Sequence, residues 1–145
     1  MSVHPDPGMP ETGEGRCLCG AVGYAWRRAP HWASHCHCES CRRATSSGMA
    51  SLFAIATGYW DWTGAAPKEF ESSPGVRRTF CDTCGSPVSF SADHYPGETH
   101  FYAGTMARPE DYRASYHVHD DERLPWMIPG DGLTRVARHE DYDHT

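Results

Sequence analysis

Three features are missing from this sequence of 145 residues, and each absence excludes a class of protein. No apolar run is long enough to span a bilayer, so we expect no membrane helix. The N-terminal stretch, MSVHPDPGMPETGEG, has neither a basic start nor an apolar segment, so we expect no signal peptide and a cytoplasmic location. Basic residues form no run longer than a pair and the net charge is −6, which argues against a nucleic-acid partner.

The composition is that of a soluble globular chain, with 39% hydrophobic and 22% charged residues. The length suits one domain with a substantial core. Residues 1–14 are rich in proline, glycine and acidic residues, which predicts a disordered lead-in. We therefore expect a folded domain over residues 15–139, followed by a polar tail over residues 140–145.

Short strands dominate the pattern of the chain. Residues 21–26 alternate, with Val22, Tyr24 and Trp26 on one face, as in a half-buried strand. Further candidates follow at close spacing, separated by glycine, proline and polar turns, and they favour an all-β fold. The other predicted strands are residues 32–38, 51–57, 59–63, 69–72, 76–81, 88–92, 100–105 and 116–119. Residues 39–46 predict a short helix.

All seven cysteines lie in clusters with the spacing of metal ligands. Seven is an odd number, so disulfides would leave a free thiol, and a reducing compartment favours metal binding instead. A redox role for the Cys-x-x-Cys segments is a weaker interpretation, because no βαβ pattern surrounds them. The set divides as four plus three, which predicts one structural zinc and one open zinc. The clusters are Cys17 and Cys19, then Cys36, Cys38 and Cys41, then Cys81 and Cys84.

The first and last clusters share a signature, since each ends in Cys-Gly followed by a small residue, valine and an aromatic. Gly20 and Gly85 would allow a tight turn where a side chain would clash or block an amide-to-sulfur hydrogen bond. Two such knuckles facing each other predict a closed four-thiolate site that ties distant segments together. Its ligands would be Cys17, Cys19, Cys81 and Cys84.

The middle cluster, Cys36, Cys38 and Cys41, lacks this glycine. If the segment is extended, Cys36 and Cys38 point to one face, with His35 and His37 on the other. A turn after Cys38 would bring Cys41 to the same metal and leave a fourth position open. The alternative is a closed site with a histidine or aspartate as the fourth ligand.

The motifs together resemble a known family. The segments GRCLCGAVGY, HCHCESCRRATSSGMAS, SSPGVRRTFCDTCGSPVSF and YHVHDDERLPWMIPGDGLTR are similar to those of the glutathione-dependent formaldehyde-activating enzymes and related centromere protein V-like proteins. The resemblance covers roughly residues 13–139. It implies a β-tent fold of antiparallel sheets around a structural zinc held by the four cysteines named above. It also implies a catalytic zinc on Cys36, Cys38 and Cys41.

The resemblance further implies a carbon–sulfur lyase that joins glutathione and formaldehyde as S-hydroxymethylglutathione. A zinc with three thiolates is a weak Lewis acid toward a carbonyl, yet it still lowers the pKa of an incoming thiol. His35, His37 or Glu39 could protonate the product oxygen, although each is more simply a supporting or surface residue. Two other functions stay open: a lyase for a different thiol adduct, and a non-catalytic zinc-binding interaction module.

Glutathione also carries two carboxylates. Arg42 and Arg43 directly follow the middle cluster and could bind a carboxylate. Adjacent helical residues diverge by about 100°, so at least one of the two is expected to face solvent. The run from Thr45 to Ser47 could bind polar groups of the substrate or simply be solvated.

Overall fold

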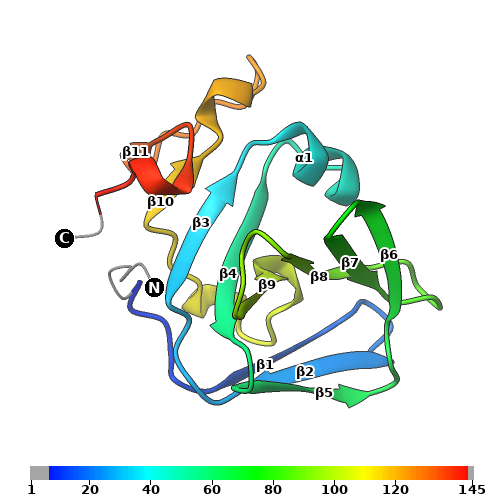
Figure 1. Cartoon of the computed structure of the whole chain (residues 1–145). Helices are drawn as coiled ribbons and strands as arrows, with labels where there is room; N and C mark the ends of the chain where they lie inside the picture. Colours follow the sequence, from blue (N-terminus) through cyan, green and yellow to red (C-terminus); the bar gives the residue numbers. More distant parts are fainter. Residues whose placement is uncertain (1–6, 144–145) are drawn as a thin grey trace.

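The protein, described here from a computed structural model over residues 7–143, is built from two β-sheets (Figure 1). The smaller sheet has the antiparallel order β1-β2-β5, and the larger has the order β11-β10-β3-β4-β9-β8-β7-β6. The small sheet runs across the lower ends of β3 and β4 in Figure 1. The strands of the small sheet are β1 (Gly13–Arg16), β2 (Val22–Trp26) and β5 (Trp60–Gly64). Those of the large sheet are β3 (Trp32–Cys36), β4 (Ala50–Ala56), β6 (Lys68–Ser73), β7 (Val76–Phe80), β8 (Pro87–Ala92), β9 (Glu98–Tyr102), β10 (Tyr116–Val118) and β11 (Thr134–Arg135).

Helical structure is short within these residues, which confirms the all-β class. One α-helix, α1 (Glu39–Thr45), follows β3 and lies near the predicted position. The 3₁₀ turns are η1 (Ala103–Thr105), η2 (Pro109–Asp111), η3 (Asp120–Glu122) and η4 (His139–Asp141). No helix of the described chain is both long and apolar enough to cross a membrane.

One edge of the large sheet corrects the expectation of purely antiparallel sheets. β10 pairs with β3 and with β11, and both pairings are parallel. Between β10 and β11 the chain runs through η3 over residues 119–133, and such a long connection is what parallel neighbours require. This edge brings residues 116–118 beside the end of β3, where Cys36 lies.

Two apolar cores form on opposite faces of the large sheet. Along β4, Phe53 and Ile55 belong to the first core, whereas Leu52 and Ala54 belong to the second. The first core is closed by the small sheet, from which Tyr24 stacks on a β9 ring, Phe101, at 4.1 Å between ring centroids. The alternation of a strand therefore directs neighbouring residues into two different environments.

The predicted lead-in is wrong over part of its length. Met9 is buried in the first core, and Gly13 and Glu14 belong to β1. Residues 1–6 of that expected segment lie outside the described residues. In the predicted tail, Tyr142 stacks on Tyr116 at 4.2 Å between centroids, while residues 144–145 lie outside the described part.

Candidate metal centres

The structure brings Cys17, Cys19, Cys81 and Cys84 together, with the four sulfur atoms all within 4.8 Å of one another. The Cys17 and Cys19 sulfurs are 3.6 Å apart, and those of Cys19 and Cys81 are 3.7 Å apart. Four sulfurs placed at about 2.3 Å around a tetrahedral zinc would lie roughly 3.8 Å apart. The arrangement therefore fits a zinc ion in size and in ligand type.

Two glycine turns hold these sulfurs, and they need glycine for its backbone freedom. Gly20 has φ +83° and donates to the carbonyl of Cys17 at 3.2 Å. Gly85 has φ +78° and donates to the carbonyl of Cys81 at 2.7 Å. A Cβ at Gly85 would meet nothing within 4 Å, and one at Gly20 would approach a single atom at 3.7 Å. The prediction of a steric clash is therefore wrong. Glycine is favoured at both positions because the backbone there has a left-handed φ, which a residue with a side chain rarely adopts.

Ser86 connects the two turns and was not singled out from the sequence. Its hydroxyl oxygen accepts a hydrogen bond from the amide of Leu18 at 3.0 Å. The same hydroxyl lies 3.2 Å from the Cys84 sulfur, and its hydrogen bond lowers the pKa of that thiol to about 5. The Val22 amide donates to the Cys17 sulfur at 3.3 Å. These contacts favour the thiolate forms that a metal requires.

The second cluster gathers Cys36, Cys38 and Cys41, again with the sulfur atoms within 4.8 Å of one another. Cys36 ends β3, Cys38 is the N-cap residue of α1, and Cys41 lies in the first turn of that helix. The Cys41 amide donates to the Cys38 sulfur at 3.3 Å, so the cap and the cluster are one local structure. Among residues 7–143, no His, Asp or Glu offers a ligand atom that joins this group, which favours the open arrangement.

The three thiols of this cluster change one another's pKa values. Hydrogen bonds from the Cys36 and Cys41 thiols lower the pKa of Cys38. The hydrogen bonds with Cys38 and Cys41 raise the pKa of Cys36, which is 5% exposed. The cluster thus already favours one thiolate, and a divalent cation would displace the remaining protons.

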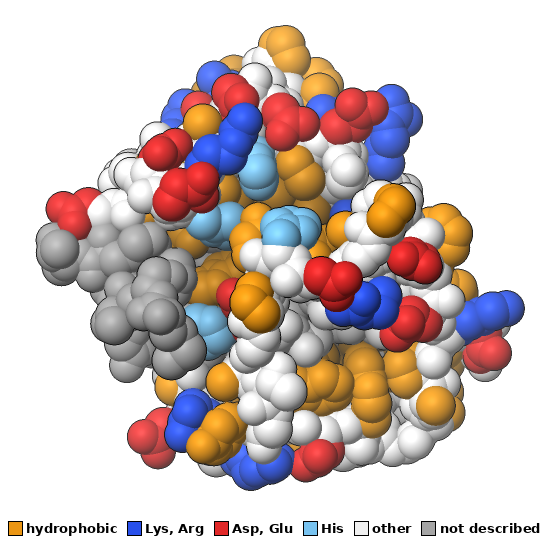
Figure 2. All heavy atoms as spheres, in the orientation of Figure 1, with side chains coloured by type: hydrophobic (Ala, Val, Ile, Leu, Met, Phe, Trp, Pro, Cys, Tyr) orange, Lys and Arg blue, Asp and Glu red, His pale blue; other side chains and the backbone are white. Residues whose placement is uncertain are grey.

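A cavity of about 280 Å³ opens at the three cysteines. Besides the cysteines, its walls carry polar side chains from distant parts of the chain, among them Arg78, Tyr95, His119 and His139. Histidine side chains also gather near the middle of the molecular face shown in Figure 2, between groups of charged residues. The three cysteines therefore border a pocket with a mixed polar and apolar lining, although Cys36 and Cys41 are themselves buried.

The three proton carriers expected from the sequence do not line this cavity. His35 Nδ1 lies 2.8 Å from Ser51 Oγ, and His37 Nε2 lies 2.8 Å from His117 Nδ1. Glu39 forms an exposed ion pair with Arg43 at 3.0 Å. The strand alternation that places Cys36 at the cavity turns both histidines to the other face, as expected.

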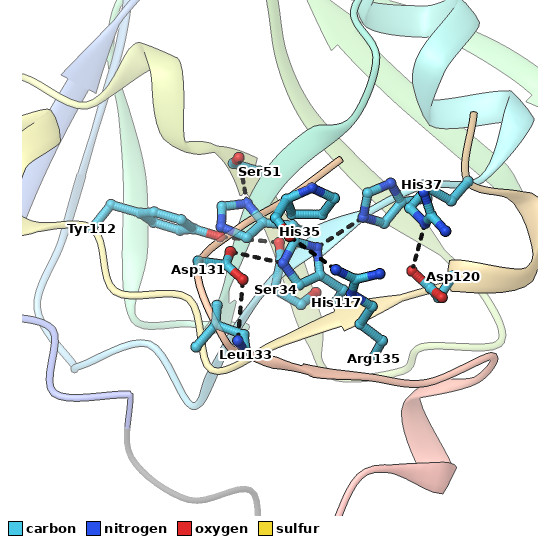
Figure 3. A network of polar contacts seen from close by, with 12 residues as sticks. Ser34, His35, His37, Ser51, Tyr112, His117, Asp120, Asp131, Leu133 and Arg135 are labelled. Atoms are coloured by element: carbon cyan, nitrogen blue, oxygen red, sulfur yellow. Dashed lines mark hydrogen bonds and ion pairs between the residues drawn. The ribbon is translucent and has the colours of Figure 1, made fainter. Parts of the chain in front are cut away.

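These histidines join a buried polar network (Figure 3). His117 bridges His37 and Asp131, and its Nε2 lies 2.8 Å from the Asp131 carboxylate. Burial lowers the pKa of His37 to about 4, and His117 acts in the same direction. The amide of Leu133 donates to Asp131 at 3.1 Å. The network connects the segment between Cys36 and Cys38 to β10 and the loop before β11, which supports the position of the cysteines.

The two arginines predicted to bind substrate lie apart from the sulfurs. Arg42 donates from Nε to the carbonyl of His37 at 3.2 Å, and it lines none of the cavities described here. Arg43 reaches a second cavity of about 410 Å³ on the other side of α1. The Thr45 hydroxyl donates to the carbonyl of Cys41 at 2.8 Å, so it takes part in a hydrogen bond within α1.

Three side chains that line the cysteine cavity, and that sequence reasoning did not assign to the site, are Arg78, Tyr95 and His119. Arg78 lies on β7, Tyr95 follows β8, and His119 follows β10. Strand pairing brings them to the cysteines across the second core. No local motif marks them, although Arg78 falls within one of the segments that carried the resemblance.

Comparisons with known proteins agree with this geometry. A family model described as glutathione-dependent formaldehyde-activating enzyme matches residues 12–122. A crystal structure of a Rhodobacter sphaeroides protein matches with a TM-score of 0.55 and 19% identity, covering 85% of this chain and 98% of the other. That likeness is one of fold. No curated protein matches the chain.

Proposed function

This chain belongs to the family of glutathione-dependent formaldehyde-activating enzymes, and we propose that it joins a thiol to a small aldehyde as a carbon–sulfur lyase. The thiol is glutathione or a related compound, the aldehyde is formaldehyde or a close analogue, and the product is an S-hydroxymethyl adduct. The observation that carries this proposal is the cluster of three cysteines, which has no fourth ligand among residues 7–143 and opens into a cavity of about 280 Å³. Three thiolates and a free position are the donor set of a catalytic zinc.

We assign zinc to both clusters. Cys17, Cys19, Cys81 and Cys84 would hold a structural ion, which their sulfur spacings of 3.6 and 3.7 Å support. Cys36, Cys38 and Cys41 would hold the catalytic ion, which supplies the positive charge that lowers the pKa of a substrate thiol. Thiolates of this kind need a reducing compartment, so we place the protein in the cytoplasm.

The cavity residues would then bring the two substrates together. The thiol sulfur attacks the aldehyde carbon, a carbon–sulfur bond forms, and the electron pair of the C=O π bond moves to oxygen. That oxygen gains one proton, which balances the proton lost by the thiol. Holding sulfur and carbonyl in one small cavity lowers the entropic barrier of the step.

Tyr95 is the proton donor that we assign to this oxygen. Burial raises the pKa of Tyr95 to about 12. The phenol is protonated at neutral pH and lines the cavity that holds Cys36 and Cys38, where it would donate a hydrogen bond to this oxygen. Its ring is positioned by His100 and Phe90, at 5.2 and 6.3 Å between centroids.

The test is the rate of adduct formation from ¹³C-formaldehyde and glutathione, followed by NMR with zinc-loaded protein. We expect acceleration over the uncatalysed reaction, its loss in Cys38→Ser, and a reduction of about tenfold or more in Tyr95→Phe. Glu39→Gln, which changes an exposed carboxylate outside the cavity, is the matched control. If the protein accelerates no reaction with a panel of aldehydes and thiols, the interaction-module hypothesis replaces this one.

A further inference from the structure

Two cavities of this protein share one wall. The cysteine-lined cavity and the second cavity of about 410 Å³ both contact Ser40, Ser72 and Arg78. The second cavity lies between α1 and β6 to β8, where Arg43, Phe70 and further strand residues surround it. In Figure 1, α1 lies next to the upper ends of β6 and β7, and residues of these three elements are among those that line the cavity. A ligand that occupies both cavities would lie against the three shared residues.

The guanidinium of Arg78 is held in place by neutral groups. Its Nε donates to Ser72 Oγ at 3.2 Å, and its Nη1 donates to the Tyr102 hydroxyl at 3.0 Å. Its central carbon lies 4.9 Å from the centroid of the Phe90 ring. The side chain is therefore ordered before any ligand arrives, which reduces the entropic cost of binding.

Arg78 has no carboxylate partner among the described residues, which distinguishes it from its neighbours at the site. Arg43 pairs with Glu39 at 3.0 Å, and Arg77 pairs with Asp93 at 3.1 Å. The Cys41 side chain is a further hydrogen-bond partner of Arg78, and a guanidinium keeps its charge in proteins. A partly buried cation bound by two hydroxyls and one cysteine, with no carboxylate partner in the described chain, can bind an additional anion at a cavity wall.

We infer that the two cavities form one divided binding site for an anionic thiol, in which Arg78 is the specificity-determining residue. The sulfur enters the cysteine-lined cavity, the body of the ligand lies in the second cavity, and a carboxylate binds the guanidinium at the shared wall. This inference rests on the proposed function. It identifies the substrate class as thiols that carry a carboxylate, and it transfers the role expected of Arg42 and Arg43 to a residue on β7.

The experiment compares two ligands with the same thiol. Zinc-loaded protein is titrated calorimetrically with reduced glutathione and with its diethyl ester, in which both carboxylates are masked. We expect the wild type to bind glutathione about tenfold more tightly than the ester. In Arg78→Gln this preference disappears while ester affinity is unchanged. Arg78→Lys keeps the charge without the planar fork and is expected to retain only part of the preference.

The controls separate this inference from folding and from the proposed function. Arg77→Gln, on the same strand but paired with Asp93, should leave the preference intact, and zinc content and thermal melts check that each variant is folded. Equal binding of both ligands to the wild type would overturn the inference and leave the lyase assignment standing. If Arg78→Gln and Arg78→Lys each lose affinity for glutathione and for the ester to the same extent, the inference is overturned too. The arginine would then only offset the charge of Cys41. Failure of the wild type to bind either ligand would overturn both proposals.

Discussion

The two cysteine clusters use the same side chain for different ends, and the difference lies in what surrounds the sulfurs. The four-cysteine cluster joins two turns that are distant in sequence, with a separation of 62 residues between Cys19 and Cys81, and it offers four sulfurs to one ion. The three-cysteine cluster comes from one short segment and opens to a cavity. A closed set that links distant segments stabilises the fold, whereas an open local set leaves a position for chemistry. The comparison teaches that topology, more than ligand type, separates the two roles.

The largest expected effect comes from removing one ligand from each cluster. Cys84→Ser should lower the free energy of unfolding by about 5 kcal/mol, because the metal that joins the two turns loses a ligand. Cys38→Ser should cost far less stability and abolish activity. Thermal melts and zinc content of the two variants measure the contrast. Equal loss of stability would mean that both clusters are structural.

Metal removal should also separate the clusters. A mild chelator is expected to extract one zinc per chain quickly, because the cavity gives access to the three sulfurs, and to leave the fold intact. The closed site should release its zinc only on unfolding. Zinc release followed by a colorimetric indicator, alongside circular dichroism, tests this. Simultaneous loss of both ions and of structure would contradict it.

A smaller effect probes the core that supports the open cluster. Glu98 accepts hydrogen bonds from Trp32 at 2.7 Å and from His31 at 3.1 Å, and His100 Nε2 lies 3.2 Å away. Burial alone would raise the pKa of Glu98, but the contacts with His100 and His31 outweigh it and hold the pKa well below its ordinary value of 4.5. A depressed carboxyl pKa adds stability above the ordinary value, and this stability is lost as the pH falls below it.

Glu98→Gln is therefore expected to lower the free energy of unfolding by about 2 kcal/mol at pH 7. The deficit should shrink as the pH falls below 4.5, where the wild-type carboxylate begins to lose its advantage. Urea unfolding of both proteins at several pH values gives the difference. Glu69→Gln, an exposed change on β6, is the control and should show no such trend. A deficit that grows toward low pH would contradict the assignment.

The smallest effect concerns the turn of the closed cluster. Gly85→Ala should cost about 1 kcal/mol, because its φ of +78° disfavours a side chain although the space is open. Gly104→Ala is the matched control, since a Cβ there also meets nothing within 4 Å and its φ is not left-handed. Stabilities from urea unfolding decide between the two. An equal effect at both positions would show that the turn tolerates a side chain.

Sequence patterns predicted the parts of this protein that depend on local order. The alternation around Tyr24 identified β2, and the glycine signatures grouped the outer cysteines. β1 escaped prediction because Gly13 and Gly15 have low strand propensity, and the structure shows why they are there. A Cβ at either position would lie within 2.4 Å of the rings of Trp26 or Tyr24 across the pair.

The cavity side chains could not be predicted in the same way. Arg78, Tyr95 and His119 are placed by strand order and register, which follow from packing of the whole chain rather than from spacing. The parallel edge formed by β10 was missed for the same reason, since three residues carry too little periodicity to show their direction. Cysteines clustered in sequence were easier to find than cavity side chains that come together only in space.

The separation of 62 residues between Cys19 and Cys81 has a consequence for synthesis of the chain. Closing a loop of that length costs roughly 3–4 kcal/mol of chain entropy, whereas the segment from Cys36 to Cys41 is nearly closed already. During translation the middle cluster emerges complete before Cys81 exists. We therefore expect the nascent chain to bind its first ion at the open cluster. The closed cluster should bind its ion last, when its two turns come together in the folded domain.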